Sequence, residues 1–586
     1  MTRKTLNSER VLQTAWLLLA VFVFGLVIAI RIRLLEIPLE RDEGEYAYAG
    51  QLMLQGIPPY KLAYNMKFPG TYVAYALIMS IFGQTITGIH FGLLLVNVAT
   101  IALIFFLGRR LINLAAGIIA AASYAVLSVS PSVLGLAAHA THFVMLPVLG
   151  GMLLLLDQSD GMGRARLIRS IRQRVSNRLA NRKGAIVVGR DRRARRMEPT
   201  SQRAVTAIHK MSHGRLFASG LLFGTGLLMK QPAVFFILFG AICLLSHDIR
   251  CGFSLKKIGL RILTFSVGAI LPFGLACLLL WHAGVFDKFW FWTIDYARQY
   301  GSLIPLGKAP HMFAQSVKQV IGPGWTLWAL AGFGLIAGLW HKETRTSTYI
   351  LLGLIAASAL ALSSGFYFRP HYFVLVLPAV SLLAGVSISR LSDVVASRTT
   401  VIRLVPLFVL GAALSLPVFA SRKLFLALSP VEASRMIYGL NPFPESIKIA
   451  EYIRDRTTPN ETIAVLGSEP QIYFYSKRHS ATGYVYTYGL MEAQSYARQM
   501  QEEMLHEIEL ARPKYLISVQ VPISWLRHPE SESLIFTWAN QYTRTYYSVV
   551  GLVNILSSDQ TDYYFAQMPK SAPRLGAYVL ICQRKS

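Results

Sequence analysis

Long uninterrupted runs of apolar residues dominate the first 420 positions of the chain. Two examples are AWLLLAVFVFGLVIAI at 15–30 and FGLLLVNVATIALIFFLG at 91–108. A helix of about 20 apolar residues is long enough to cross the hydrocarbon core of a bilayer. We therefore predict a polytopic α-helical membrane protein with about eleven transmembrane helices, at residues 11–30, 86–107, 111–129, 141–156, 215–230, 231–247, 258–280, 324–340, 347–362, 371–388 and 402–419.

The pattern changes after residue 420. The remaining residues carry an ordinary density of charge, and segments with helix-like periodicity alternate with short strand-like segments. These segments lie at 446–456, 461–467, 495–511 and 514–520. Such an alternation is typical of a small α/β domain. The chain is therefore predicted to have a transmembrane domain at 1–420 and a soluble α/β domain at 421–586.

Basic residues in the short connections predict the orientation. Every second connection carries Lys or Arg, at 109–110, 158–215, 247–257, 341–348 and 389–403. Positively charged connections stay on the cytoplasmic side, so the N-terminus is expected inside. With eleven helices, the loop 31–85 and the domain 421–586 are then both extracytoplasmic. The first apolar run lacks a small-residue cleavage site and is expected to remain as the first transmembrane helix.

Composition supports a membrane protein and limits its partners. Only 15% of the 586 residues are charged, against about 25% in soluble proteins. The net charge is +28, and the loop 158–215 alone holds 16 Lys and Arg against three acidic residues. We interpret this loop as a cytoplasmic segment that contacts anionic lipid, and we expect no nucleic-acid partner. The four cysteines have neither metal-ligand spacing nor a disulfide pattern.

The loop 31–85 holds the candidate chemistry. Asp42 and Glu43 follow the first predicted helix directly, and Tyr46 comes one helical turn later. Placing an ionisable group close to hydrocarbon costs free energy. An acidic pair at the end of a transmembrane helix therefore indicates either exposure to water or a function. The residues alone leave two interpretations open. The pair is either a solvated part of an interfacial loop, or it supplies a general base or a metal ligand.

Four segments in the expected order resemble the C-type (GT-C) glycosyltransferases. Asp42-Glu43 followed by KFPG at 67–70 is similar to the first external loop of this superfamily. The group of the protein O-mannosyltransferases and bacterial aminoarabinose transferases, family 39-like, is the most similar. The other three segments are ASGLLFGTGLLMKQPAVFF (218–236), FYFRPHYFVLVLPAVSLLAG (366–385) and EPQIYFYSKRHSATGY (469–484).

This resemblance implies a GT-C fold and a membrane glycosyltransferase. Such enzymes pass a sugar from a polyprenyl-phosphate donor to an acceptor protein, lipid or glycan on the extracytoplasmic face, here of the cell (inner) membrane. We expect inversion at the sugar, with Asp42 as general base and Glu43 supporting it or contacting the acceptor. The cations expected to bind the donor phosphate are Lys67, Lys230, Arg369 and His371. Lys230 has a second, equally supported interpretation: it lies at a helix end and extends its ammonium group to the membrane interface without binding phosphate.

A divalent metal ion remains possible, and no other cofactor is expected. Some relatives carry a second acidic residue before the fourth helix, where this chain has His139 and His142 instead. These histidines either bind a metal together with Asp42, or pack and contact substrate. The segment 286–301 is expected to lie on the membrane interface with Trp290 and Trp292 as aromatic anchors. Its Asp295 is expected to line the substrate cavity, and Asp295 and Tyr46 are candidates for contact with the acceptor or a metal.

Two other functions compete with this interpretation. A flippase for lipid-linked sugars would be expected to show paired half-repeats with broken helices, and the sequence shows no such repeat. A polymerase or ligase that moves a whole lipid-linked glycan would use a similar cavity, and the sequence leaves it open. A sensor without catalytic activity would leave the Asp42-Glu43 pair unexplained.

Overall fold

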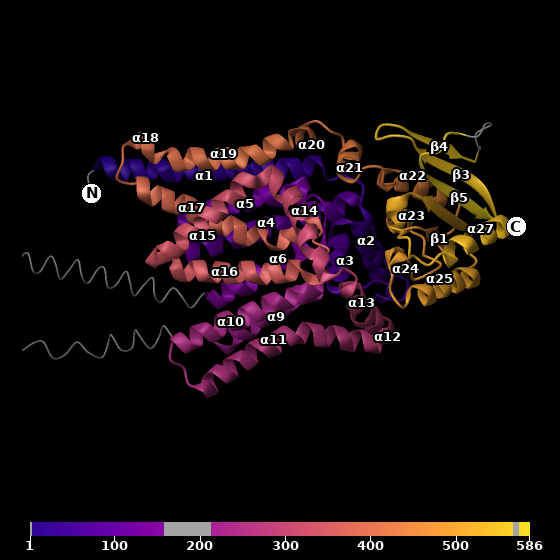
Figure 1. The fold of residues 1–586 in the computed structure, drawn as a ribbon, viewed down its shortest axis with the longest axis horizontal. Coiled ribbons are helices and arrows are strands. Elements are labelled where there is room, and N and C mark those ends of the chain that lie inside the picture. The colour runs from indigo at the N-terminus through magenta and orange to yellow at the C-terminus, as the bar shows by residue number, and fades with distance from the viewer. Residues whose placement is uncertain (1–2, 157–211, 567–572, 586) are drawn as a thin grey trace, which may run out of the picture.

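The computed structural model describes residues 3–156, 212–566 and 573–585. A long bundle of helices carries a smaller domain with a β-sheet at one end (Figure 1). Most of the Arg-rich loop 158–215 lies outside the described residues.

Each of the eleven predicted transmembrane segments coincides with a helix of the bundle. Eight described segments are at least 18 residues long and apolar enough to cross a membrane. The other three helices, α5, α6 and α9, have 16 or 17 residues. The prediction of a multi-pass helical membrane protein is therefore confirmed. The helices are α1 (Arg3–Arg33), α4 (Ile86–Leu111), α5 (Leu114–Val129), α6 (Ala140–Leu156), α9 (His213–Met229), α10 (Val234–Arg250), α11 (Leu255–His282), α15 (Trp325–Trp340), α16 (Lys342–Leu362), α17 (Leu377–Val395) and α19 (Val405–Ala420).

Small residues bring helices of the bundle into close contact. On α9, a Cβ atom added to Gly220 would lie 2.1 Å from the carbonyl oxygen of Phe265 on α11. A Cβ on Gly224 would lie 2.2 Å from the carbonyl oxygen of Ala269. Burial of apolar surface does not drive association between helices in lipid, so close backbone packing over small residues supplies much of the stabilisation.

The loop 31–85 folds into two helices, α2 (Arg41–Leu54) and α3 (Gly70–Phe82). A capping box begins α2: the Glu40 carboxylate accepts from the Glu43 backbone N–H at 2.9 Å, and Glu43 accepts from the Glu40 N–H at 3.3 Å. Nearly all of α2 is buried. The cap therefore fixes the orientation of the first turn, in which Asp42 lies.

Short helical elements join the long helices. They are η1 (Pro131–Val133), η2 (Gln231–Ala233), α12 (Phe286–Trp290), the π-helix η3 (Phe291–Tyr296), α13 (Ala297–Ser302), η4 (Leu306–Lys308), α14 (Ala309–Ile321), η5 (Gly322–Gly324), η6 (Ser364–Phe366), η7 (Pro370–Leu375) and α18 (Thr400–Arg403). The expectation that 286–301 rests on the membrane is wrong for its central part. Trp292 is buried, and its ring centre lies 5.9 Å from that of Tyr64 and 5.7 Å from that of Tyr484. This segment contacts the C-terminal domain, because its aromatic side chains pack against aromatic side chains there, as Trp292 does against Tyr484.

The C-terminal domain has a five-stranded sheet of order β1-β2-β5-β3-β4. Strand β1 pairs with β2 in parallel, and the other pairs are antiparallel. The four predicted segments correspond to α22, β1, α25 and β2. The elements are α20 (Arg422–Leu426), α21 (Pro430–Tyr438), α22 (Phe443–Arg454), β1 (Ile463–Leu466), α23 (Gln471–Ser476), α24 (Tyr488–Met491), α25 (Ala497–Ala511), β2 (Tyr515–Gln520), α26 (Pro522–Trp525), α27 (Leu534–Tyr546), β3 (Tyr547–Ile555), β4 (Thr561–Phe565) and β5 (Ala577–Arg584).

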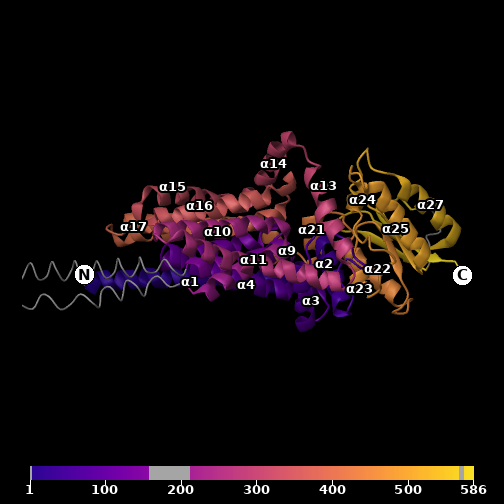
Figure 2. The same ribbon diagram turned by 90° about the horizontal axis from the view of Figure 1, so that it is seen from below.

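The helices α2 and α3 share one hydrophobic core with the sheet. Tyr48 of α2 packs on Tyr473 of α23, with 5.2 Å between their ring centres. The same cluster of buried side chains continues to Val465 and Ile517, which are register partners in β1 and β2. Figures 1 and 2 show α2 between the bundle and the C-terminal domain. The loop 31–85 therefore joins the two parts of the molecule.

Candidate active site

A cavity of 540 Å³ lies where the bundle meets the C-terminal domain. Its walls come from α2, the segment 64–68, the connection between α9 and α10, the segment 292–301, the residues around η7 and the segment 486–492. Six residues singled out from the sequence line it, namely Asp42, Tyr46, Lys67, Lys230, Arg369 and His371. The fold thus brings together side chains that lie up to 329 positions apart in the sequence.

Asp42 is held by a network of short polar contacts. Lys67 Nζ donates to Asp42 Oδ1 at 2.9 Å and to Glu45 Oε2 at 2.7 Å. Glu45 lies three residues after Asp42 on α2, and its other oxygen accepts from the Tyr72 hydroxyl at 2.7 Å. Tyr486 of the C-terminal domain donates to Asp42 Oδ1 at 3.3 Å. These contacts leave Asp42 Oδ2 without a hydrogen-bond donor within the described part of the chain.

The surroundings keep Asp42 ionised. Burial by itself raises the pKa of this carboxyl group, but the ammonium charge of Lys67 and the hydrogen bond that it donates lower it further than burial raises it. The resulting pKa lies well below the usual range of an aspartate. Asp42 is therefore a carboxylate at neutral pH, as a general base must be.

Glu43 lies on another side of α2 and does not line the cavity. Its Oε1 accepts from the backbone N–H of Ala138 at 2.6 Å and lies 3.0 Å from His90 Nε2. The side chain is 1% exposed. Of the two roles expected for Glu43, this placement favours support of Asp42, because the buried carboxylate already has its partners and fixes α2 against the bundle.

Lys230 and Arg369 supply cations from the bundle side. Lys230 Nζ lies 3.5 Å from the centre of the Tyr372 ring, and the Arg369 guanidinium lies 5.4 Å from the centre of the Tyr367 ring. Pro370 begins η7, and Arg369 before it has the extended backbone that a following proline favours (φ −59°, ψ 144°). Both side chains line the cavity.

One group of described residues could hold a metal ion. Asp42, His139 and His371 each offer a ligand atom, and these atoms lie within 4.8 Å of one another. A carboxylate with two imidazoles suits zinc. However, the His139 and His371 rings are stacked, with centres 4.1 Å apart and planes 11° apart. Lone pairs lie in the ring planes, so these nitrogens do not converge on one point unless a ring turns. The donor set fits a metal ion, whereas the ring orientation does not.

Of the two alternatives that the sequence left open for His142, the structure favours packing. His142 lies in the first turn of α6 and is not part of this group, although its backbone N–H donates to the His139 carbonyl at 3.0 Å. Both ring nitrogens of His142 are buried without a hydrogen-bond partner among the described side chains. Asp295 requires correction: it is exposed and does not line the cavity, whereas its neighbours Ile294 and Tyr296 do.

Sequence reasoning missed several residues of the site. Glu45 was detectable, because residues three apart on a helix share a face and Asp42 was already a candidate. The residues of the segment 486–492 gave no such signal. Tyr486, Tyr488 and Glu492 belong to the C-terminal domain and enter the cavity only through the packing of the two domains.

Comparison with known proteins identifies the fold. No family model and no curated protein sequence matches the chain. The structure is similar to that of ArnT from Cupriavidus metallidurans bound to undecaprenyl phosphate, with a TM-score of 0.56 and 15% identity over 97% of this chain and 98% of that one. ArnT in the apo state gives a TM-score of 0.54 at 14% identity, with the same coverage. The oligosaccharyltransferase of Archaeoglobus fulgidus gives 0.48 at 13% identity, over 95% of this chain and 75% of that one.

The similarity to ArnT confirms the fold class expected from the sequence. The chain has the GT-C fold of membrane glycosyltransferases. It matches ArnT along nearly the full length of both chains.

Proposed function

We propose that the protein is a membrane glycosyltransferase. It transfers a sugar from a polyprenyl-phosphate donor to an acceptor on the extracytoplasmic face, with inversion at the anomeric carbon. The observation that carries this proposal is the ionised Asp42 in a cavity that Lys230 and Arg369 also line. The fold shared with ArnT, which has been crystallised with undecaprenyl phosphate, supports the choice of donor.

Asp42 acts as the general base. Its oxygen Oδ2 is free of donors and accepts the proton of the acceptor hydroxyl while the acceptor oxygen bonds to the anomeric carbon. The bond between the anomeric carbon and the phosphate oxygen breaks in the same displacement, and polyprenyl phosphate leaves with the electron pair. Because Lys67 lowers the basicity of Asp42, the proton moves late, when the acceptor oxygen has become acidic.

Arg369 and Lys230 bind the donor phosphate. Negative charge grows on the leaving phosphate as its bond to the sugar breaks, so these cations stabilise the transition state more than the ground state. His371, beside Arg369, borders the same space. Lys67 has a different main role, because its ammonium group already bridges Asp42 and Glu45. We assign it to holding the base, and we assign no step to a metal ion.

We further propose that the domain 421–586 lies outside the cell (inner) membrane and that the domain 1–420 spans it. The cavity combines residues from three connections predicted to be external, 31–85, 281–323 and 363–370, with residues of the C-terminal domain. One side of the membrane must hold all of them. The basic pair Arg109-Arg110 ends α4 at its other end, as the positive-inside rule requires.

The Asp42→Asn variant tests this function. It keeps the size of the side chain but removes the base, so transfer of radiolabelled sugar from polyprenyl phosphate to membrane acceptors should fall about 100- to 10,000-fold. Binding of undecaprenyl phosphate should remain. The matched control is Asp295→Asn, an exposed aspartate outside the cavity, which should transfer sugar like the wild type. Normal transfer by Asp42→Asn would remove Asp42 from the mechanism, and absence of transfer by the wild type would refute the function.

A further inference from the structure

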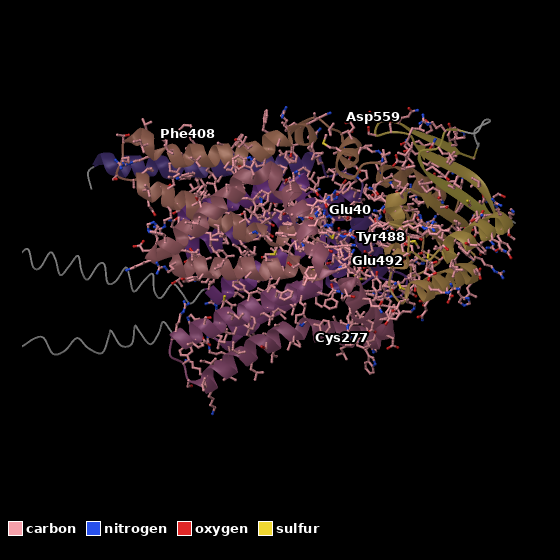
Figure 3. All side chains as sticks on the ribbon, viewed as in Figure 1. Glu40, Cys277, Phe408, Tyr488, Glu492 and Asp559 are labelled. Atoms are coloured by element: carbon pink, nitrogen blue, oxygen red, sulfur yellow. The ribbon has the colours of Figure 1, made fainter. Side chains whose placement is uncertain are left out.

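The cavity contains a second carboxylate that the proposed mechanism does not use. Glu492 directly follows α24 in the C-terminal domain, and Figure 3 shows it close to Tyr488 at the junction with the bundle. Its Oε2 accepts from the Tyr296 hydroxyl at 2.7 Å. No other side chain or backbone group that the structure describes donates to this carboxylate. Glu492 lines the cavity and is only half-buried, so Oε1 is available to a ligand.

Aromatic rings line the same cavity as Glu492. Tyr300 of α13 lines the cavity and stacks on Tyr367, with ring centres 4.5 Å apart and planes 11° apart. Tyr296 packs against Trp292 at 5.1 Å on the same wall. A sugar ring presents apolar C–H faces, which pack on aromatic rings, and hydroxyl groups at its edge, which donate to a carboxylate. The combination of Glu492 with these rings therefore suits a sugar.

The charges in the cavity argue against a cationic ligand. Among the described residues, Lys67, Lys230, Arg298 and Arg369 line it. The carboxylates that oppose them are Asp42 and Glu492 on the wall, and Glu45 behind Lys67. An ammonium group would meet this excess of positive charge. A neutral polyhydroxylated ligand meets no such repulsion.

We propose that Glu492 binds hydroxyl groups of a neutral sugar ring while the Tyr300 ring packs on its C–H face, and that these two contacts select which sugar the cavity accepts. This inference rests on the proposed function for the role of that sugar in transfer, but the binding itself does not require transfer. Burial raises the pKa of Glu492 to about 7. Both its forms can bond to a hydroxyl, since the carboxylate accepts and the acid also donates.

Glu492→Gln tests the contact, because the amide oxygen still accepts from Tyr296 while the carboxylate is lost. The protein is placed in lipid nanodiscs without sugar detergents, and methyl glycosides of several hexoses and pentoses are titrated by saturation-transfer NMR. We expect at least one glycoside to bind the wild type and to bind Glu492→Gln about tenfold or more weakly. Tyr300→Ala is a second variant that should also weaken binding, whereas Tyr300→Phe should not.

The matched control is Glu503→Gln. Glu503 is held by Lys288 and by the Tyr484 hydroxyl at the same junction of the two domains, but it does not line the cavity. If Glu492 only held the domains together, Glu492→Gln and Glu503→Gln would lower the affinity for the glycosides to the same extent. Equal affinity of the wild type and Glu492→Gln, absence of binding by every glycoside, or tighter binding of methylammonium than of the glycosides would each overturn the proposal.

This test separates the inference from the proposed function. Transfer by the wild type and Asp42→Asn tests the function, whereas glycoside binding by the wild type and Glu492→Gln tests the subsite, so each idea has its own readout. Sugar binding that depends on Glu492 in a protein without transferase activity would leave the subsite intact and refute the function. Sugar transfer in a protein whose glycoside binding does not depend on Glu492 would refute the subsite and leave the proposed function intact.

Discussion

Neighbouring acidic residues on one helix have separate tasks in this protein. Asp42 faces the cavity, Glu43 is buried against Ala138 and His90, and Glu45 shares Lys67 with Asp42. The reason is helix geometry, because successive residues point about 100° apart whereas residues three positions apart point in similar directions. A motif of two adjacent acids therefore does not by itself supply two catalytic carboxylates.

At the scale of a residue, Glu492 should make stability depend on pH. Burial raises the pKa of Glu492 from 4.5 to about 7, while the Tyr296 hydroxyl and the charge of Arg369 oppose this shift. A carboxyl with a raised pKa in the folded protein stabilises the fold fully below pH 4.5, and this contribution is lost as the pH rises through 7. The melting temperature of the wild type should therefore fall relative to that of Glu492→Gln over this window. A difference between the two proteins that does not change with pH would contradict the shift.

At the scale of an element, the position of α2 depends on close contact with α23. A Cβ atom at Gly44 would lie 2.7 Å from the Gln471 backbone nitrogen and 2.8 Å from its Cβ. Gly44→Ala should therefore destabilise the protein by about 1–3 kcal/mol through overpacking, although alanine favours a helix more than glycine does. It should also lower transfer, because α2 carries Asp42. Thermal unfolding and the sugar-transfer assay measure the two effects.

Gly259→Ala in α11 is the matched control, since a Cβ there meets nothing within 4 Å. We expect it to leave stability unchanged or to raise it by up to about 1 kcal/mol through helix propensity. If both substitutions changed the melting temperature equally, close packing of α2 on α23 would not explain the glycine at position 44.

The elements of the bundle were predictable because apolar length alone determines whether a helix crosses a bilayer. The first strands of the sheet were predictable for a similar reason, since 461–467 and 514–520 are short apolar runs next to amphipathic helices. The segment 286–301 was misplaced. Its aromatic residues suit a membrane interface and a protein core equally, and only the tertiary structure decides that Trp292 is buried.

The site was predictable mainly through the four segments that resemble GT-C glycosyltransferases. These segments contain Asp42, Lys67, Lys230 and Arg369, which line one cavity in the structure. Sequence reasoning could not decide between metal ligation and packing for His142, and it did not bring His371 next to His139, because both outcomes depend on where α6 begins and on how η7 packs. It could not find Glu492, since no periodicity in the C-terminal domain shows which loop faces the bundle.

At the scale of the whole molecule, the cavity is complete only when both parts of the chain are in contact. A buried ion pair lies at this contact: Arg41 Nη2 of α2 lies 2.7 Å from Glu469 Oε1, and the side chains are 8% and 0% exposed. Arg41 also donates to the Tyr488 hydroxyl at 2.7 Å and to Asn441 at 3.0 Å. The pair thus connects the helix that carries Asp42 to the segment that carries Tyr486 and Glu492.

Removal of Glu469 should therefore affect the protein far more than removal of an exposed partner. In Glu469→Ala, Arg41 remains buried without its counter-ion, which typically costs about 3–5 kcal/mol. In the control Glu502→Ala, the lost ion pair is exposed, with 63% of the Arg498 side chain and 54% of the Glu502 side chain accessible. A loss of about 0–1 kcal/mol of stability is expected there.

Replacing both Arg41 and Glu469 by methionine should recover much of the stability in thermal unfolding, because no buried charge is left unpaired. Transfer should not recover to the same extent, since Tyr488 and Asn441 also lose the contacts that position α2. Equal melting temperatures for Glu469→Ala and Glu502→Ala would show that this ion pair does not hold the two domains together.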